Sequence, residues 1–209
     1  LNLIGTLRLD FNSEVFTNDA TVQFATGGRA VNFSIPAGQT RAVFPNNETQ
    51  IRLQTGSVAG VITVTPAFAT EGGINLTPAT PPTLRMTIAE AAPRIIGVVV
   101  GARTQSSITL LISGYATSRS VTQMQLQFAP VSGENVSTTS ATVPVEAAFL
   151  AWFRSAQSAA FGSLFTASVP LTLQGDTTNV SSLADALQSV SVTLGNALGT
   201  SPAVSVSLR

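Results

Sequence analysis

Alternation of apolar and polar residues along the first ninety positions predicts short β-strands. In "GTLRLDF" (Gly5–Phe11), Leu7, Leu9 and Phe11 alternate with Arg8 and Asp10, which is the period of a strand with one buried face. The same rhythm returns at intervals of about 8–12 residues, a spacing typical of a β-sandwich. About seven strands are expected here, in the stretches "GTLRLDF", "ATVQFA", "AVNFSIPAGQ", "RAVFP", "TQIRLQTG", "VAGVITVTPAF" and "PPTLRMTIAE".

A second run of strands follows "AEAAPR" (89–94), where small residues and a proline mark the preferred domain boundary. Its strands are expected in "PRIIGVVVGA", "SSITLLISGY", "VTQMQLQFAP", "FTASVPLTLQGD" and the closing "SVSVTLGNALGTSPAVSVSL". The stretch 70–82 is read as a long loop inside the first domain. We therefore predict an all-β protein of two tandem Ig-like β-sandwich domains, residues 1–91 and 92–209.

One stretch breaks the strand pattern. "VEAAFLAWFRSAQSAAFG" (145–162) is rich in alanine, and Phe149, Trp152, Phe153 and Ala156 recur at helical spacing. We predict a short helical insert near residues 146–158 in the second domain. Large aromatic residues at this spacing are expected to anchor a core. If they were exposed, they would form a partner site.

The second domain resembles the Ig-like IPT/TIG-type modules that occur in tandem in bacterial secreted and surface proteins. The likeness lies in "PRIIGVVV", in "SSITLLISGYA" and in the closing "VSVTLGNALGTSPAVSVSL", and it covers about residues 92–209. The helical insert departs from the small form of such a module. The resemblance implies export to the cell surface or the extracellular space and a non-catalytic role, and it transfers no functional residues.

The composition narrows the functional classes. Charged residues make up 10% of the 209, against about 25% in a typical domain, and the formal net charge is zero. All the cations are arginines and none is clustered, so neither nucleic acid nor an anionic membrane surface is an expected partner. Cys and His are both absent, which makes a zinc site or thiol chemistry very unfavourable. No cofactor is expected.

The terminus and the apolar runs bear on compartment. The chain begins with Leu1 rather than Met, so we expect a piece of a longer protein whose export signal or anchor lies elsewhere. We see no apolar run of about 18 or more residues that would span a membrane as a helix. The expected partners are the other domains of the parent protein, and glycans or surface proteins.

The polar cluster "YATSRS" (115–120) is the first candidate site. Tyr115, Ser118 and Arg119 could line a ligand pocket, or a serine could act as a nucleophile. A nucleophilic serine needs a base within hydrogen-bonding reach, and neither His nor Lys is present to serve. The Gly-x-Ser-x-Gly turn of the hydrolases is also missing. We favour the reading of this segment as a loop between two strands.

Carboxylates are the second candidate. Glycoside hydrolysis needs two facing carboxylates about 5–10 Å apart. The ten acidic residues are scattered, at Asp10, Glu14, Asp19, Glu48, Glu71, Glu90, Glu134, Glu146, Asp176 and Asp185. Calcium could be considered at "NSEVFTND" (12–19) and "GDTTN" (175–179), but neither has the repeated carboxylates of a tight site. Both are read as solvated loops, and no metal is expected.

Three functions remain open. The favoured one is a non-catalytic spacer or adhesion segment of a larger secreted bacterial protein. A carbohydrate-binding module is the first alternative, and it requires exposed aromatic residues such as Tyr115 or Trp152. A subunit of a polymeric surface assembly is the second, and it requires an unpaired edge strand or a groove that accepts a neighbour's strand. The flat apolar segment "PRIIGVVVGA" (93–102) is the expected edge.

Overall fold

The computed structural model describes residues 1–15, 17–177 and 179–209. Within these ranges all the paired strands are antiparallel, and they are accompanied by one α-helix, so the predicted all-β class is confirmed. The chain divides into two compact units. One consists of Leu1–Ala89 with Ala159–Gly162, and the other of Glu90–Ser158 with Ser163–Arg209. The sequence had not set the short segment 159–162 apart from the rest of 92–209.

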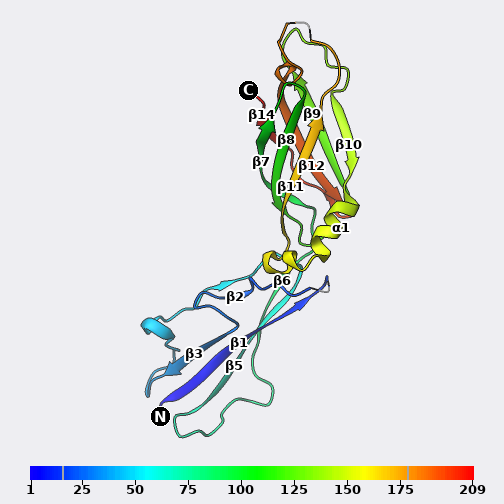
Figure 1. Ribbon diagram of the computed structural model, residues 1–209. Coiled ribbons are helices and arrows are strands. Elements are labelled where there is room, and N and C mark those ends of the chain that lie inside the picture. The colour runs from blue at the N-terminus through cyan, green and yellow to red at the C-terminus, as the bar shows by residue number, and fades with distance from the viewer. Residues whose placement is uncertain (16, 178) are drawn as a thin grey trace. The chain divides into compact units, whose positions relative to one another are not determined.

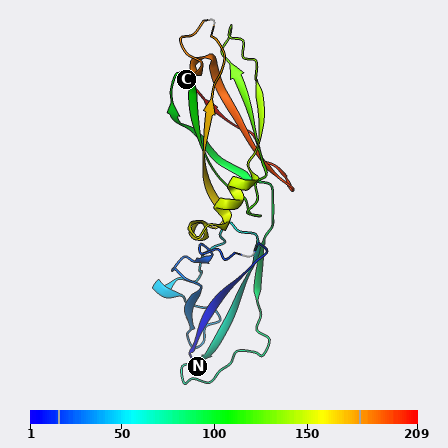
Figure 2. The same ribbon diagram turned by 45° about the vertical axis from the view of Figure 1, so that its right-hand side comes forward.

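The first unit is built on a four-stranded sheet in the order β3–β1–β5–β6. Its two long central strands, β1 and β5, run side by side in both Figure 1 and Figure 2. The predicted alternation is visible in β1, where Leu9 is buried between exposed Arg8 and Asp10. The strands are β1 (Leu3–Ser13), β3 (Ala30–Ile35), β5 (Gly60–Thr70) and β6 (Leu84–Ile88).

The second layer of this unit is smaller than the sequence suggested. It contains β2 (Gln23–Phe24) and β4 (Leu53–Gln54), which pair over two residues each. The 3-10 turn η1 (Pro45–Asn47) follows a segment that lies beside β3 of the larger sheet. The expected strand in "RAVFP" is reduced to one isolated bridge between Val43 and Ser34. Residues 71–83 connect β5 to β6 within the unit, as predicted. The buried core is formed by Leu9, Val22, Phe24, Val31, Ile62 and Val64.

The second unit is a two-layered sandwich (Figure 1). One layer has the order β11–β8–β7, and the other has the order β10–β9–β12–β13, with β14 also paired to β12. One apolar cluster fills the space between the layers, with Ile108, Leu110, Leu126, Val190 and Val192 fully buried. The strands are β7 (Arg94–Arg103), β8 (Ser107–Tyr115), β9 (Gln123–Pro130), β10 (Ser140–Pro144), β11 (Leu164–Thr172), β12 (Leu187–Asn196), β13 (Gly199–Thr200) and β14 (Val204–Ser207).

The chain crosses from one layer to the other through a helical connection. After β10 come α1 (Glu146–Arg154) and the 3-10 turn η2 (Gln157–Phe161), which lead into β11, and a second 3-10 turn, η3 (Ala184–Ala186), precedes β12. Phe149 and Phe153 are 7% and 6% exposed, and their rings meet that of Phe165 edge-on at 4.9 and 6.4 Å between centroids. The predicted helical insert is confirmed, and its aromatic face belongs to the core.

Candidate binding site

The "YATSRS" segment lies at the end of β8 and in the loop before β9, and its arginine holds that loop to the helix. Arg119 has a φ of +50°. Its guanidinium donates hydrogen bonds to the carbonyl oxygen of Phe153 and to Ser158 Oγ (2.8 Å). It also lies 5.1 Å from the centroid of the Phe153 ring, within the range of a cation–π interaction. The guanidinium of Arg119 therefore holds the C-terminal end of α1 against this loop.

The other two members of that candidate site also have structural surroundings. Ser118 Oγ accepts a hydrogen bond from Nδ2 of Asn196 (3.1 Å), the last residue of β12. Tyr115 is half-buried at the end of β8. Neither these residues nor Arg119 lines the cavity described below, so the structure does not gather them around a ligand.

Asp19 is the acidic residue with the most unusual environment. Its side chain is inaccessible to solvent and accepts hydrogen bonds from the Thr21 N–H (2.9 Å), the Thr21 hydroxyl (2.6 Å), the Ser57 N–H (2.8 Å) and the Val58 N–H (3.0 Å). Burial alone would raise the pKa of Asp19, but these hydrogen bonds outweigh it and hold the pKa below its ordinary value. The carboxylate ties together two loops of the first unit.

The remaining carboxylates were candidates for metal binding or acid–base chemistry. Within the described ranges, no three acidic side chains gather closely enough to hold a metal ion. Asp185 forms an ion pair with Arg103 at 2.5 Å, and a hydrogen bond from Ser182 is the main cause of its lowered pKa. In each calcium candidate one residue, 16 or 178, lies outside the described residues. Asp19 and Asn179 already bond to protein groups there.

The second unit leaves one side open, between the outer strands β10 and β11 of its two layers. We call this side the β10–β11 seam, bounded by Ser140–Pro144 and Leu164–Thr172. Among the described residues β10 pairs with β9 alone and β11 with β8 alone. A strand at the edge of a sheet presents a row of N–H and C=O groups that can pair with another chain.

The register identifies which backbone groups of β11 face the seam. The Leu173 N–H donates to Ser106 O (2.8 Å) and the Ala116 N–H to Ser163 O (3.2 Å), so the odd-numbered residues of β11 bond to β8. The even-numbered residues, Leu164 to Thr172, point their backbone groups outward. The indole N–H of Trp152 supports this assignment of the outward residues, because it donates a hydrogen bond to Leu164 O (3.1 Å).

The same reasoning applies to β10. The Phe128 N–H donates to Thr139 O (2.8 Å) and the Val145 N–H to Thr122 O (3.1 Å), so odd-numbered residues bond to β9. Ser140 and Thr142 therefore direct both their backbone groups into the seam. Pro144 in β10 and Pro170 in β11 occupy outward positions too, where each offers a carbonyl oxygen but no N–H.

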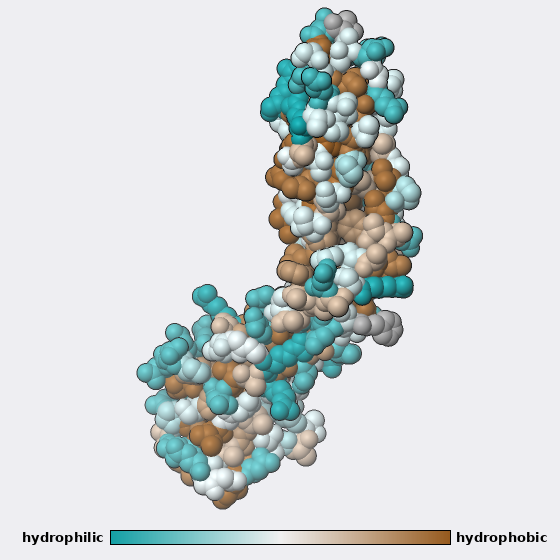
Figure 3. Space-filling view, viewed as in Figure 1, coloured by the Kyte–Doolittle hydropathy of each residue, from teal (hydrophilic) through white to brown (hydrophobic). Residues whose placement is uncertain are grey.

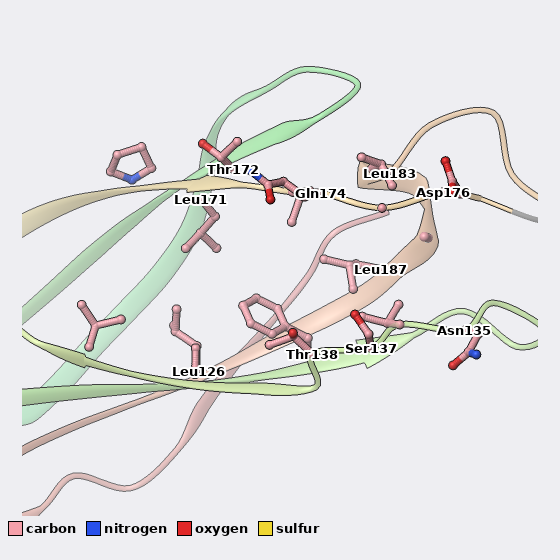
Figure 4. A pocket seen from close by; sticks show the side chains of 18 residues that line it. Leu126, Asn135, Ser137, Thr138, Leu171, Thr172, Gln174, Asp176, Leu183 and Leu187 are labelled. Atoms are coloured by element: carbon pink, nitrogen blue, oxygen red, sulfur yellow. The ribbon is translucent and has the colours of Figure 1, made fainter.

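A cavity of about 540 Å³ lies between the layers at the seam. In Figure 4, Leu171 and Leu187 project into it, whereas Thr172 points away. Its apolar wall includes Leu126, Phe128, Val143, Leu171, Leu173 and Leu187, and its polar rim includes Asn135, Ser137, Thr138, Thr172, Gln174 and Asp176. Asp176 is the one formally charged residue among those that line it.

The predicted edge strand is also present. β7, which contains most of "PRIIGVVVGA", ends the three-stranded sheet, and Ile96 and Val99 are 64% and 56% exposed. Figure 3 shows mainly neutral and apolar residues over the visible face of the second unit, with hydrophilic residues gathered toward its upper loops. The sequence indicated this edge but did not reveal the seam. Pro144 and Pro170 were the available signal, since proline inside an alternating strand is confined to sheet edges.

No family model matches the sequence. No curated protein matches it either. Among the solved structures that match is that of the FN1–FN3 domains of chicken CNTN1, with 14% sequence identity and a TM-score of 0.30. The match covers 99% of this chain and 56% of that chain, so this chain spans about half of its length. No helix among the described residues has the length and apolarity needed to cross a membrane.

Proposed function

We propose that this chain is a non-catalytic, exported module that serves as a spacer or adhesion segment of a larger secreted or surface protein. The observation that carries the proposal is that the reactive side chains of this chain are engaged in contacts within the protein. The candidates for chemistry bond to the protein itself, as Arg119 does to α1 and Asp19 to the Ser57 loop. What the second unit leaves available is backbone and apolar surface at the β10–β11 seam.

The two units suit a spacer because each has its own hydrophobic core. Domains with separate cores can bear load or separate other domains without a shared site. The low charge and the Ser- and Thr-rich strands suit an exported β-module, and the IPT/TIG-like pattern of residues 92–209 supports the same assignment.

A subunit of a polymeric surface assembly is the second candidate, and the open edges favour it. Such a subunit needs an edge or a groove that a neighbour can complete, and both β7 and the β10–β11 seam offer one. The carbohydrate-binding alternative gains less support. Phe149 and Phe153 are buried, and the Trp152 indole is tied to Leu164, so these rings do not form a stacking platform.

Single-molecule force spectroscopy, with the chain held at its two ends, tests the spacer role. We expect two separate unfolding events with length gains of roughly 300 and 400 Å, the extended lengths of about 90 and 120 residues. A chain that extends smoothly, without distinct events, would contradict the proposal. Incubation with a panel of chromogenic glycosides and esters should give no turnover, and turnover would revive an enzymatic function.

A further inference from the structure

We propose that the β10–β11 seam receives an extended polypeptide segment from a different protein, which lies as a strand between the two sheet edges. The inference rests on the proposed function as an adhesion module and names the ligand of its site. Its first support is the backbone. Ser140 and Thr142 on one side, and Ser168 and Thr172 on the other, direct N–H and C=O groups into the seam. A strand can satisfy such groups along its length.

The cavity determines the side chains of the ligand. One face of an inserted strand would meet the apolar wall formed by Leu126, Phe128 and Leu171, and the other face would meet solvent. Successive residues of a strand point to opposite faces, so the ligand alternates apolar and small polar residues. A uniformly apolar segment would leave half of its side chains exposed.

Charge sets the direction of the ligand. Asp176 is the single formal charge among the described residues that line the cavity, and the ion pair of Arg103 is made with Asp185. None of the described residues that line the cavity is an arginine. A segment with a basic residue at the end near Asp176 and no acidic residue elsewhere complements this surface. A different protein is favoured over a second copy, because every strand among the described residues is already paired in a sheet and none is free to insert into a neighbour.

The two prolines limit how the ligand pairs. Pro144 and Pro170 each remove one outward N–H, so neither edge offers an uninterrupted ladder to any passing strand. Edges protected in this way resist indiscriminate aggregation. Binding therefore depends on both the few remaining backbone groups and the apolar cavity, which confers selectivity.

Fluorescence anisotropy with a labelled synthetic peptide tests the proposal on the full chain. The probe is the amidated peptide RVTVSVTVS, which alternates and carries one arginine. Its control is RVPVSVPVS, in which prolines replace two outward-facing threonines and interrupt the pairing while all four valines are kept. We expect the first peptide to bind and the second not to bind. Leu171→Arg, which places a charge in the cavity, should weaken binding about tenfold or more.

A second pair of variants tests the backbone without altering the core. Ser168 is exposed, and its N–H points away from β8, so Ser168→Pro removes a seam donor while keeping the sheet intact. The loss of one hydrogen bond should weaken peptide binding about threefold to tenfold. Ser168→Ala, the matched control, should bind as the unaltered chain does. Circular dichroism and the Trp152 fluorescence verify that each variant is folded.

The outcomes separate the possible occupants. Failure of the alternating peptide to bind, or equal binding of the proline-interrupted peptide, overturns the strand. Binding of dodecanoate in place of the peptide, with the same dependence on Leu171, assigns the cavity to a small apolar molecule and overturns it too. A concentration-dependent dimer that Leu171→Arg abolishes assigns the seam to a second copy. None of these results bears on the two unfolding events expected of a spacer.

Discussion

Replacing Asp19 by Asn should sharply destabilise the first unit. The buried carboxylate accepts four hydrogen bonds, two from Thr21 on one oxygen and one each from Ser57 and Val58 on the other. An Asn side chain can offer its oxygen to one pair of donors only. Its NH₂ group then faces the other pair of hydrogen-bond donors, which are left without an acceptor.

The magnitude follows from the two hydrogen bonds that are lost. A hydrogen bond to a charged group contributes about 1.5–3 kcal/mol, so the variant should lose about 3 kcal/mol or more of unfolding free energy. A unit of about 90 residues has roughly 4–13 kcal/mol in total. At about 4–8 °C per kcal/mol, the melting temperature of the first unit should fall by about 12 °C or more.

Differential scanning calorimetry measures this change, with Trp152 fluorescence as an independent monitor of the second unit. Asp10→Asn is the matched control, because Asp10 is exposed on β1 and the chemical change is identical. It should alter the stability by less than about 0.5 kcal/mol. Equal, small effects of the two substitutions would refute the role given to the buried carboxylate.

The same residue gives a pH dependence. Because the folded-state pKa of Asp19 lies below its unfolded value, its contribution is complete above the unfolded pKa of about 3.9 and is lost as the pH falls through the folded value. The first unit should therefore weaken in acid, below about pH 4. In the Asp19→Asn variant, the stability of the first unit should fall less between neutral and acidic pH. The same loss of stability in acid for both proteins would contradict the lowered pKa of Asp19.

The remaining expectations concern the anchored loop, a glycine and sugars. Arg119→Lys should cost the second unit about 1–2 kcal/mol in denaturant unfolding, since an ammonium cannot reproduce the planar contacts, whereas exposed Arg154→Lys should be neutral. Gly56→Ala should destabilise the first unit more than Gly28→Ala. Both have a φ of +73°, but only at Gly56 would a Cβ lie 2.5 Å from Asp19 Oδ2; equal losses would argue against that contact. A panel of soluble glycans should leave the melting temperatures unchanged. A glycan that did bind, at a hundred times its Kd, would raise the free energy of unfolding by about 2.7 kcal/mol, so binding would be visible in this assay.

The fold class could be predicted from the sequence because the alternation of apolar and polar residues is a local signal. The pattern predicts that Leu9, between Arg8 and Asp10, is buried, and the structure confirms it. The helical spacing of Phe149 and Phe153 predicts their burial in the same way. The same signal overestimated the number of strands in the first unit. "RAVFP" alternates like a strand, but pairing needs a neighbour at the right register, and Val43 finds only one bridge.

Pro144 and Pro170 are local signals of two sheet edges, but no local pattern shows that the two edges bound one opening. β10 and β11 are separated in the chain by α1 and η2, and only the sheet order makes them the two edges of one opening. The sequence predicts a solvated loop around Asp19, yet the Ser57 and Val58 N–H groups that enclose this carboxylate come from a distant segment. Contacts between segments far apart in sequence decided both features.

Amide hydrogen exchange, followed residue by residue by NMR, tests the open seam most directly. In the free chain, the amides of Thr142, Ser168 and Thr172 should exchange fast, while those of Val143 and Leu171, which bond to neighbouring strands, should be protected. Addition of the alternating peptide should protect the first group as well. Protection of these outward amides in the free chain, or their continued fast exchange with the peptide bound, would contradict a seam that receives a strand.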